Sequence, residues 1–92
     1  MIKVQREKNL CGYYFLCFDL NGRSFIIFTH TTYRNIAKGI QNEIKYQIKN
    51  GIFNQNIKGE YCIILARYKR IKKPIFTGLI HHWVSVVSRK IK

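Results

Sequence analysis

The stretch that most constrains the fold runs from Thr32 to Gly51, where apolar residues recur at three- and four-residue spacing. This spacing predicts one long helix with a single apolar face. The residues on that face are Tyr33, Ile36, Ala37, Ile40, Ile44 and Ile48. Thr31 or Thr32 can cap the start of the helix, and Gly51 can end it in the left-handed conformation. Because such a helix is not stable alone, its isoleucine stripe requires an apolar surface from the rest of the chain.

Segments on both sides of this helix predict β-strands, because they are rich in aromatic and β-branched residues. They are Gly12–Leu20 and Arg23–Thr29 before the helix, and Glu60–Tyr68 and Gly78–Val87 after it. Asn21 and Gly22 join the first two, and this dipeptide is the strongest short hairpin signal. A basic turn, Lys69–Lys73, separates the last two, and Pro74 ends any strand pairing there. Residues 1–9 are polar and basic, and either a short edge strand or a frayed terminus fits them.

The order β-β-α-β-β predicts an α+β fold, with a four-stranded, mostly antiparallel sheet and one helix packed on one face. We expect a single basic α+β domain over residues 1–92. One helix cannot cover both faces of such a sheet, so one face should be largely open. Because the strands carry apolar and aromatic residues on both faces, the open face is expected to be a binding platform or a dimer interface. Trp83 is expected to anchor the core.

The charge balance limits the function. The 92 residues include 17 Lys and Arg but only four Asp and Glu, which gives a formal net charge of +13. Self-repulsion at this charge disfavours the compact state, and a polyanionic partner would offset it. Because 47% of the residues are hydrophobic, the chain is not a disordered basic tail. Nucleic acid is therefore the first candidate partner, and an anionic membrane surface is the second.

Two groups of residues form the predicted binding surface. After Glu60 the chain contains no acid, and the segment RYKRIKK combines cations with a tyrosine that could stack on a base. The helix carries further cations in one sector beside its apolar stripe. The predicted nucleic-acid- or partner-binding residues are Arg34, Lys38, Lys45 and Lys49 on the helix, and Arg67, Tyr68, Lys69, Arg70, Lys72 and Lys73 in the basic segment. The alternative for each group is a charged surface that only keeps the protein soluble.

Metal, cofactor and enzymatic functions find little support in the sequence. Cys11, Cys17 and Cys62 lack CxxC spacing and are expected to be reduced, mostly buried thiols. His81 and His82 are adjacent on a predicted strand, so they should face opposite sides and cannot chelate one ion together. Cys62 and His81 could meet across neighbouring strands, but no third group is evident to orient them. We therefore predict no catalytic residue, no metal site, no cofactor and no small-molecule substrate.

Targeting signals are not evident in the sequence. The N-terminal residues MIKVQREKN are charged, but no continuous apolar stretch follows them, so we expect no secretory signal. The longest apolar run, Tyr13–Phe18, is far shorter than the ~20 residues of a membrane-spanning helix. We expect a cytoplasmic protein without a membrane partner.

A small, strongly basic chain with HTTYRNIAKGIQNEIKYQIKNG between two hairpin-like halves resembles bacteriophage anti-CRISPR proteins, in particular the eighth type I-F anti-CRISPR family. The resemblance covers the length and element order of the whole chain, without a diagnostic motif. It implies a non-enzymatic inhibitor in the cytoplasm of the host bacterial cell. Such an inhibitor binds the type I-F CRISPR RNA-guided surveillance complex, contacts Cas proteins and guide RNA, and blocks target DNA hybridisation.

Two other classes of function are open at this stage. A free-standing RNA- or single-stranded-DNA-binding module would use the open sheet face and the basic segment as its platform. A small enzyme such as a nuclease would need a metal or a general base that the sequence does not show. Binding to naked nucleic acid at physiological salt distinguishes a free-standing module from an inhibitor that requires the assembled complex.

Overall fold

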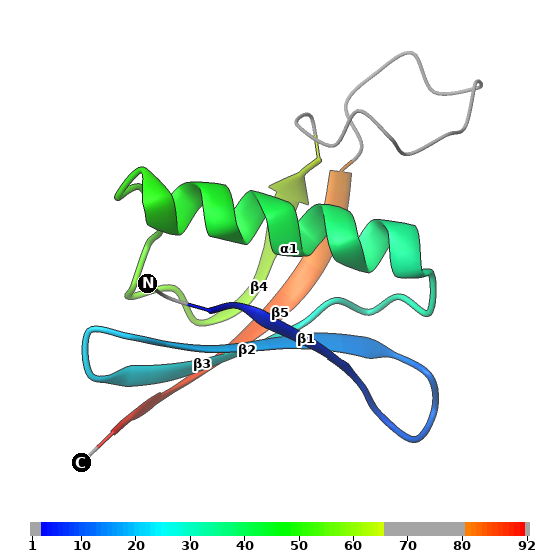
Figure 1. Ribbon diagram of the computed structural model, residues 1–92, viewed down its shortest axis with the longest axis horizontal. Coiled ribbons are helices and arrows are strands. Elements are labelled where there is room, and N and C mark those ends of the chain that lie inside the picture. The colour runs from blue at the N-terminus through cyan, green and yellow to red at the C-terminus, as the bar shows by residue number, and fades with distance from the viewer. Residues whose placement is uncertain (1–2, 66–80, 92) are drawn as a thin grey trace.

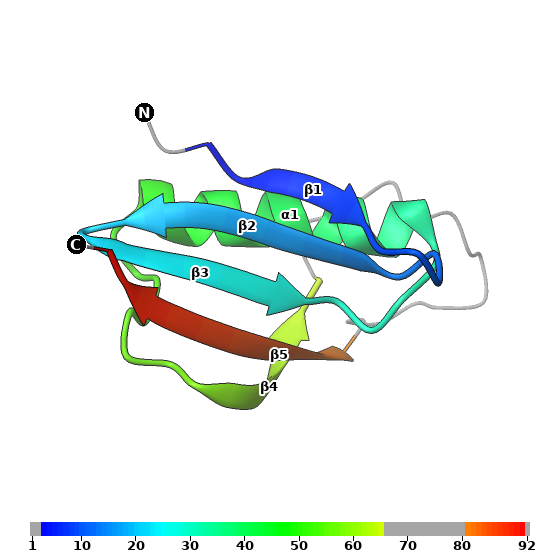
Figure 2. The ribbon, with the colours of Figure 1, turned by 90° about the horizontal axis from the view of Figure 1, so that it is seen from below.

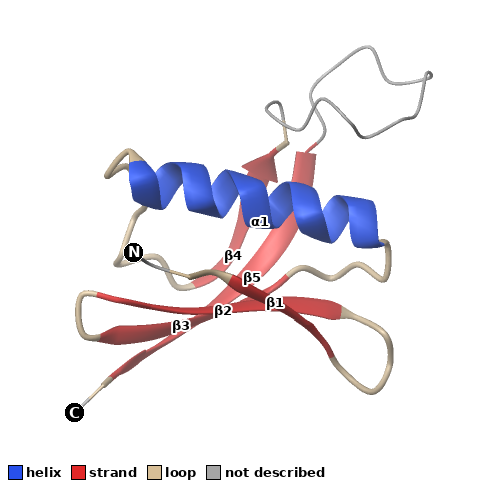
Figure 3. Ribbon diagram, in the orientation of Figure 1, coloured by secondary structure: helices blue, strands red, loops and turns tan. Residues whose placement is uncertain are grey.

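One helix lies across one face of a five-stranded antiparallel sheet, so the protein has an α+β fold (Figures 1 and 3). The computed structural model describes residues 3–65 and 81–91. In chain order the elements are β1 (Gln5–Lys8), β2 (Tyr14–Leu20), β3 (Arg23–Phe28), α1 (Arg34–Lys49), β4 (Gly59–Ile64) and β5 (His81–Lys90). The predicted strand at Glu60–Tyr68 corresponds to β4, and the one at Gly78–Val87 corresponds to β5; residues 66–68 and 78–80 lie outside the described ranges.

The strands are arranged in the order β1-β2-β3-β5-β4, and every neighbouring pair is antiparallel (Figure 2). The prediction of four strands was therefore one strand short, because the N-terminal segment forms the edge strand β1. Its sequence, QREK, lacks the apolar alternation that identifies a half-buried strand. It is held by pairing with β2, with Arg6 opposite Leu16, and by Val4, which is buried just before it.

The turn between β2 and β3 has the conformation that the sequence predicts. Asn21 and Gly22 both have positive φ, 50° and 76°, and Leu20 pairs with Arg23 on either side of them. Two consecutive residues with positive φ match the right-handed twist of the flanking strands, which is why Asn-Gly is favoured here. The turn fixes the β2–β3 register, which sets the face on which each side chain lies.

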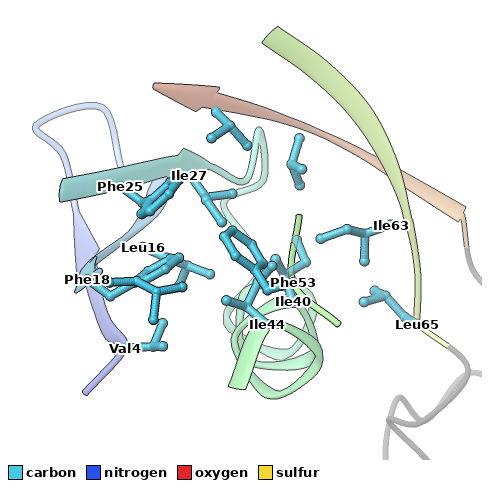
Figure 4. Close-up of a cluster of buried hydrophobic side chains, with 13 residues drawn as sticks. Val4, Leu16, Phe18, Phe25, Ile27, Ile40, Ile44, Phe53, Ile63 and Leu65 are labelled. Atoms are coloured by element: carbon cyan, nitrogen blue, oxygen red, sulfur yellow. The ribbon is translucent and has the colours of Figure 1, made fainter. Parts of the chain in front are cut away.

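The core lies between α1 and the sheet (Figure 4). Ile40 and Ile44 are completely buried at the middle of the helical stripe, as the spacing predicts. They belong to one buried cluster with apolar side chains from all five strands or the segments that flank them: Val4, Leu16, Phe18, Leu20, Phe25, Ile27, Ile63, Leu65, Val84 and Val86. Since each of these side chains is almost fully removed from water, hydrophobic burial is the main attraction between the two layers.

Phe53, in the Asn-rich connector after α1, closes one end of this core. Its ring packs edge-on against Phe18 at 5.5 Å and against Phe25 at 5.4 Å, while Phe18 and Phe25 stack at 5.2 Å. Edge-to-face and offset-stacked pairs are the favoured geometries for aromatic rings. The connector is therefore anchored to the sheet.

The ends of α1 differ in part from the prediction. The N-cap residue is Tyr33, which makes no side-chain capping bond, so the predicted cap by Thr31 or Thr32 was wrong. The Thr31 hydroxyl instead accepts the Tyr33 N–H in the turn before the helix. Tyr33 itself is 73% exposed and does not belong to the apolar face, because it precedes the first helical residue. Gly51 follows the helix with φ 68°, as predicted.

The central role of the helical stripe can be tested by truncation. Replacing Ile40 or Ile44 with Ala should lower the free energy of unfolding by about 2–5 kcal/mol, because each change leaves a cavity in the core. The exposed Lys38→Ala and Lys45→Ala variants are controls on the same helix and should change it by less than about 0.5 kcal/mol. Urea denaturation measures both groups, and equal losses for isoleucines and lysines would contradict the packing of α1.

The hairpin turn offers a test of backbone conformation alone. Gly22→Val should lower the free energy of unfolding by about 1–2 kcal/mol, because a β-branched residue is strained at positive φ. No heavy atom lies within 4 Å of a Cβ built at Gly22, so a steric clash cannot account for the loss. Asn21→Gly is the matched control and should be tolerated. Unchanged thermal stability of Gly22→Val would contradict the positive-φ turn.

Candidate nucleic-acid interface

The four helical residues of the predicted binding site lie together on the exposed face of α1. Arg34, Lys38, Lys45 and Lys49 are all exposed, and the apolar stripe of the helix faces the sheet. The structure therefore brings these four cations into one row along the helix. The other predicted site residues lie outside the described residues: Arg67, Tyr68, Lys69, Arg70, Lys72 and Lys73.

The row of cations does not stabilise the helix that carries it. Arg34 and Lys38 are four residues apart, as are Lys45 and Lys49, and like charges at this spacing are destabilising. Arg34 also lies in the first turn, which contains no acid and where the helix dipole disfavours positive charge. Only Lys49, in the last turn, is placed where the dipole favours a cation. An anionic ligand on this face would relieve these repulsions.

Strand β1 extends this row, which sequence reasoning missed. Arg6 donates from Nη1 to the Gln41 Oε1 at 3.3 Å, and Gln41 donates from Nε2 to the Val4 carbonyl at 2.8 Å. Gln41 lies one helical turn from both Lys38 and Lys45, so Arg6 joins the helical row at its middle. The signal was present in the alternation of Val4, Arg6 and Lys8, which places both cations on the helix side of the strand.

Tyr14 supports both β1 cations. The guanidinium of Arg6 lies 5.9 Å from the centre of the Tyr14 ring, and the Lys8 ammonium lies 5.3 Å from it. Both are within cation–π range, so the ring orients the two side chains without neutralising them. Below, the α1–β1 basic surface means these two residues together with the four helical cations: Arg6, Lys8, Arg34, Lys38, Lys45 and Lys49.

No helix or strand of the described residues covers the opposite face of the sheet, as predicted for a sheet with one helix (Figure 2). Strand alternation places the following residues on it: Phe15, Cys17, Ile26, Phe28, Cys62, Ile64, Trp83 and Val87. The ring of Trp83 is 61% exposed there, so the expectation that Trp83 anchors the core was wrong. Its neighbours Val84 and Val86 face the helix instead, because the β4–β5 register pairs Trp83 with Cys62 on the outer side.

Acidic residues distinguish the open face from the helix side. Glu7, Asp19 and Glu60 are exposed and share the face of Phe15 and Trp83, where Arg89 is the one cation among the described strand residues. The fourth acid, Glu43, is buried on α1 and accepts a hydrogen bond from Gln47 at 2.9 Å. Charge is thus segregated between the two faces, with cations on the helix side and carboxylates on the open side.

The histidine and cysteine side chains of β2, β4 and β5 contact residues on neighbouring strands or loops. His81 and His82 face opposite sides, as predicted, and His82 hydrogen-bonds through Nε2 to the Thr29 carbonyl. The Cys62 Sγ lies 3.7 Å from His81 Nδ1, so this predicted pair does meet across β4 and β5. Burial, together with the neighbouring Glu7 carboxylate, raises the pKa of the Cys17 thiol, which keeps that thiol protonated. Cys11 is exposed, contrary to the expectation of mostly buried thiols.

Neither a metal cluster nor a membrane span is found in the described ranges. Within residues 3–65 and 81–91, no group of three or more His, Cys, Asp or Glu side chains is placed to hold an ion. In the same ranges, no helix is long and apolar enough to cross a membrane.

Comparisons with protein-family models, curated proteins and solved structures find no match to this chain. They therefore neither support nor oppose the resemblance to anti-CRISPR proteins, which stays a prediction. The functional argument depends on the charges and surfaces of the chain itself.

The like-charge pairs on α1 lead to a stability test. Replacing Arg34 and Lys38 with Gln removes one repulsive pair and changes helix propensity little. The free energy of unfolding at low ionic strength should stay unchanged or rise by about 0.2–0.5 kcal/mol. Urea denaturation of this variant is compared with the exposed, uncharged control Asn42→Gln. If the free energy of unfolding falls by more than about 1 kcal/mol, Arg34 and Lys38 stabilise the fold through structural contacts. Their presence would then not indicate a ligand.

Proposed function

We propose that this protein is a non-catalytic binding protein that docks onto a ribonucleoprotein. Its α1–β1 basic surface contacts the RNA backbone, and its open sheet face contacts a protein subunit. The observation that carries the proposal is the segregation of charge between the two faces. A protein that needed charge only for solubility would gain from mixing both signs over its surface.

The α1–β1 basic surface suits a phosphate backbone. From Arg34 to Lys49 the helix rises by about 22 Å, at 1.5 Å per residue, which is long enough to follow several phosphates of one strand. All four cations on this helix are exposed, and the only acid of the helix is buried on another side. Contacts of this kind neutralise phosphates without reading base sequence, so they fit an RNA whose sequence varies.

The open sheet face suits a protein partner better than nucleic acid. Its exposed apolar residues, with Trp83 as the largest, form a surface of the kind that protein interfaces bury. Glu7, Asp19 and Glu60 on the same face would repel phosphates. The alternative function, a free-standing nucleic-acid-binding module, would use the open sheet face as its platform. The carboxylates on that face disfavour this alternative.

The type I-F CRISPR surveillance complex is the first ribonucleoprotein to test, because the resemblance to the eighth type I-F anti-CRISPR family names it. On this proposal the protein engages Cas subunits and guide RNA together and prevents target DNA from hybridising. The basic segment with Arg67, Lys69, Arg70, Lys72 and Lys73 belongs to the same proposal, although it lies outside the described residues.

Salt dependence tests the phosphate contacts. If the four cations of α1 each contact a phosphate of single-stranded RNA, the log–log slope of affinity against salt should include a contribution of roughly −3 from them. The variant with Arg34, Lys38, Lys45 and Lys49 all changed to Gln should lose that contribution. Binding to purified type I-F surveillance complex is measured across a salt series, with Asn42→Gln as the control.

The basic segment is tested in the same assay by changing Lys69, Arg70, Lys72 and Lys73 to Glu, which should abolish binding to the complex. If wild type and both variants bind the complex equally and without salt dependence, the cations serve solubility and the proposal fails. If wild type does not bind the complex but binds naked RNA tightly, the protein is a free-standing RNA-binding module instead.

A further inference from the structure

A small aromatic pocket opens where β2 begins and β3 ends. Its volume is about 210 Å³, below the range of sites for drug-sized ligands, so one planar group is the size of occupant that it suits. The residues that line it are Asn9, Tyr13, Tyr14, Phe28 and His30. Tyr13 and Phe28 are both partly exposed, so their rings are available to a ligand.

Local hydrogen bonds fix the loop that forms one wall. The Asn9 Oδ1 accepts the backbone N–H groups of Cys11 and Tyr13, each at 3.0 Å. The Asn9 N–H donates to the Tyr13 carbonyl at 2.9 Å, and the Gly12 N–H donates to the Asn9 carbonyl at 3.0 Å. These bonds use the Asn9 carbonyl oxygens, and the amide nitrogen of its side chain can still donate toward a ligand.

His30 forms another wall in an uncommon backbone conformation. Its φ is 55°, a value that few non-glycine residues adopt and that concentrates at functional sites. Its Nε2 hydrogen-bonds to the Ser85 Oγ at 2.7 Å, and the preceding residue, Thr29, donates from Oγ1 to the Tyr14 carbonyl at 2.7 Å. Ser85 on β5 therefore holds the imidazole, and the Thr29 bond ties the chain just before His30 to β2.

The pocket lies at one end of the sheet, where Phe28 comes from the open face and Tyr14 from the helix side. Tyr14 connects it to the α1–β1 basic surface, because the Tyr14 ring lies 5.3 Å from the Lys8 ammonium and 5.9 Å from the Arg6 guanidinium. Lys8 is also followed directly by Asn9, another residue of the pocket wall. A strand whose phosphates contact Lys8 would therefore pass close to the pocket.

We propose that this pocket accepts one unstacked nucleobase of a single-stranded RNA whose backbone lies on the α1–β1 basic surface. The inference rests on the proposed function. It adds that the RNA ligand is single-stranded and has one base turned out of the stack. Aromatic walls stack on any base, and the Asn9 amide and His30 imidazole can hydrogen-bond to its edge. A buried aliphatic side chain from a protein partner would leave these polar groups unused.

The test uses a short single-stranded RNA that carries 2-aminopurine, whose fluorescence is quenched by stacking. Wild type should quench it, and the same RNA with an abasic site should bind about tenfold more weakly. The Tyr13→Leu, Phe28→Leu double variant keeps apolar volume but loses both rings, so it should also lose about tenfold in affinity and the quenching. Its salt slope should be unchanged, because the phosphate contacts are retained.

Ile52→Ala, which removes an exposed apolar side chain just beyond the end of α1 farther from His30, is the control and should bind RNA like wild type. Circular dichroism confirms that each variant is folded. If wild type binds the RNA but the double variant binds and quenches equally well, or if Ile52→Ala loses as much affinity, the pocket assignment is wrong while the basic surface stands. If wild type binds no RNA even at low salt, both proposals fail.

Discussion

A single helix can cover only one face of a five-stranded sheet, and the remaining features of this protein depend on that constraint. Ile40 and Ile44 join α1 to the sheet through a core with side chains from every strand or its flanking segment. The helix takes the apolar residues of one sheet face and leaves Phe28, Trp83 and their neighbours on the other face in contact with water. The two exposed surfaces of the molecule therefore have different chemistry.

Charge follows the same division. The cations of α1 and β1 surround the covered face, while three of the four carboxylates lie on the open face. The arrangement costs stability, because like charges repel along the helix and the net charge is +13. A phosphate backbone on the helix side would offset that repulsion, and an apolar protein surface would cover the open side. We interpret the fold as one that holds these two binding surfaces back to back.

Much of the fold could be predicted, because strong local patterns agreed with the tertiary structure. The isoleucine stripe and the Asn21-Gly22 turn are of this kind. The sequence left strand β1 open as one of two alternatives for the N-terminal residues, because pairing with β2 decides it. The exposure of Trp83 could not be predicted, because register decides it and β5 has apolar residues on both faces. Four of the six residues of the α1–β1 basic surface were evident from helical periodicity, whereas Arg6 and the pocket around His30 depend on contacts between residues distant in sequence.

The central claim is that nucleic acid meets the helix side of the molecule. The most direct measurement is a titration of the isotope-labelled protein with single-stranded RNA at low salt, followed by nuclear magnetic resonance of the backbone amides. The account predicts chemical-shift changes along α1, in β1 and around His30, with little change at Asp19 or Ile64 on the rest of the open face. Changes concentrated on the open sheet face, or none at all, would contradict it.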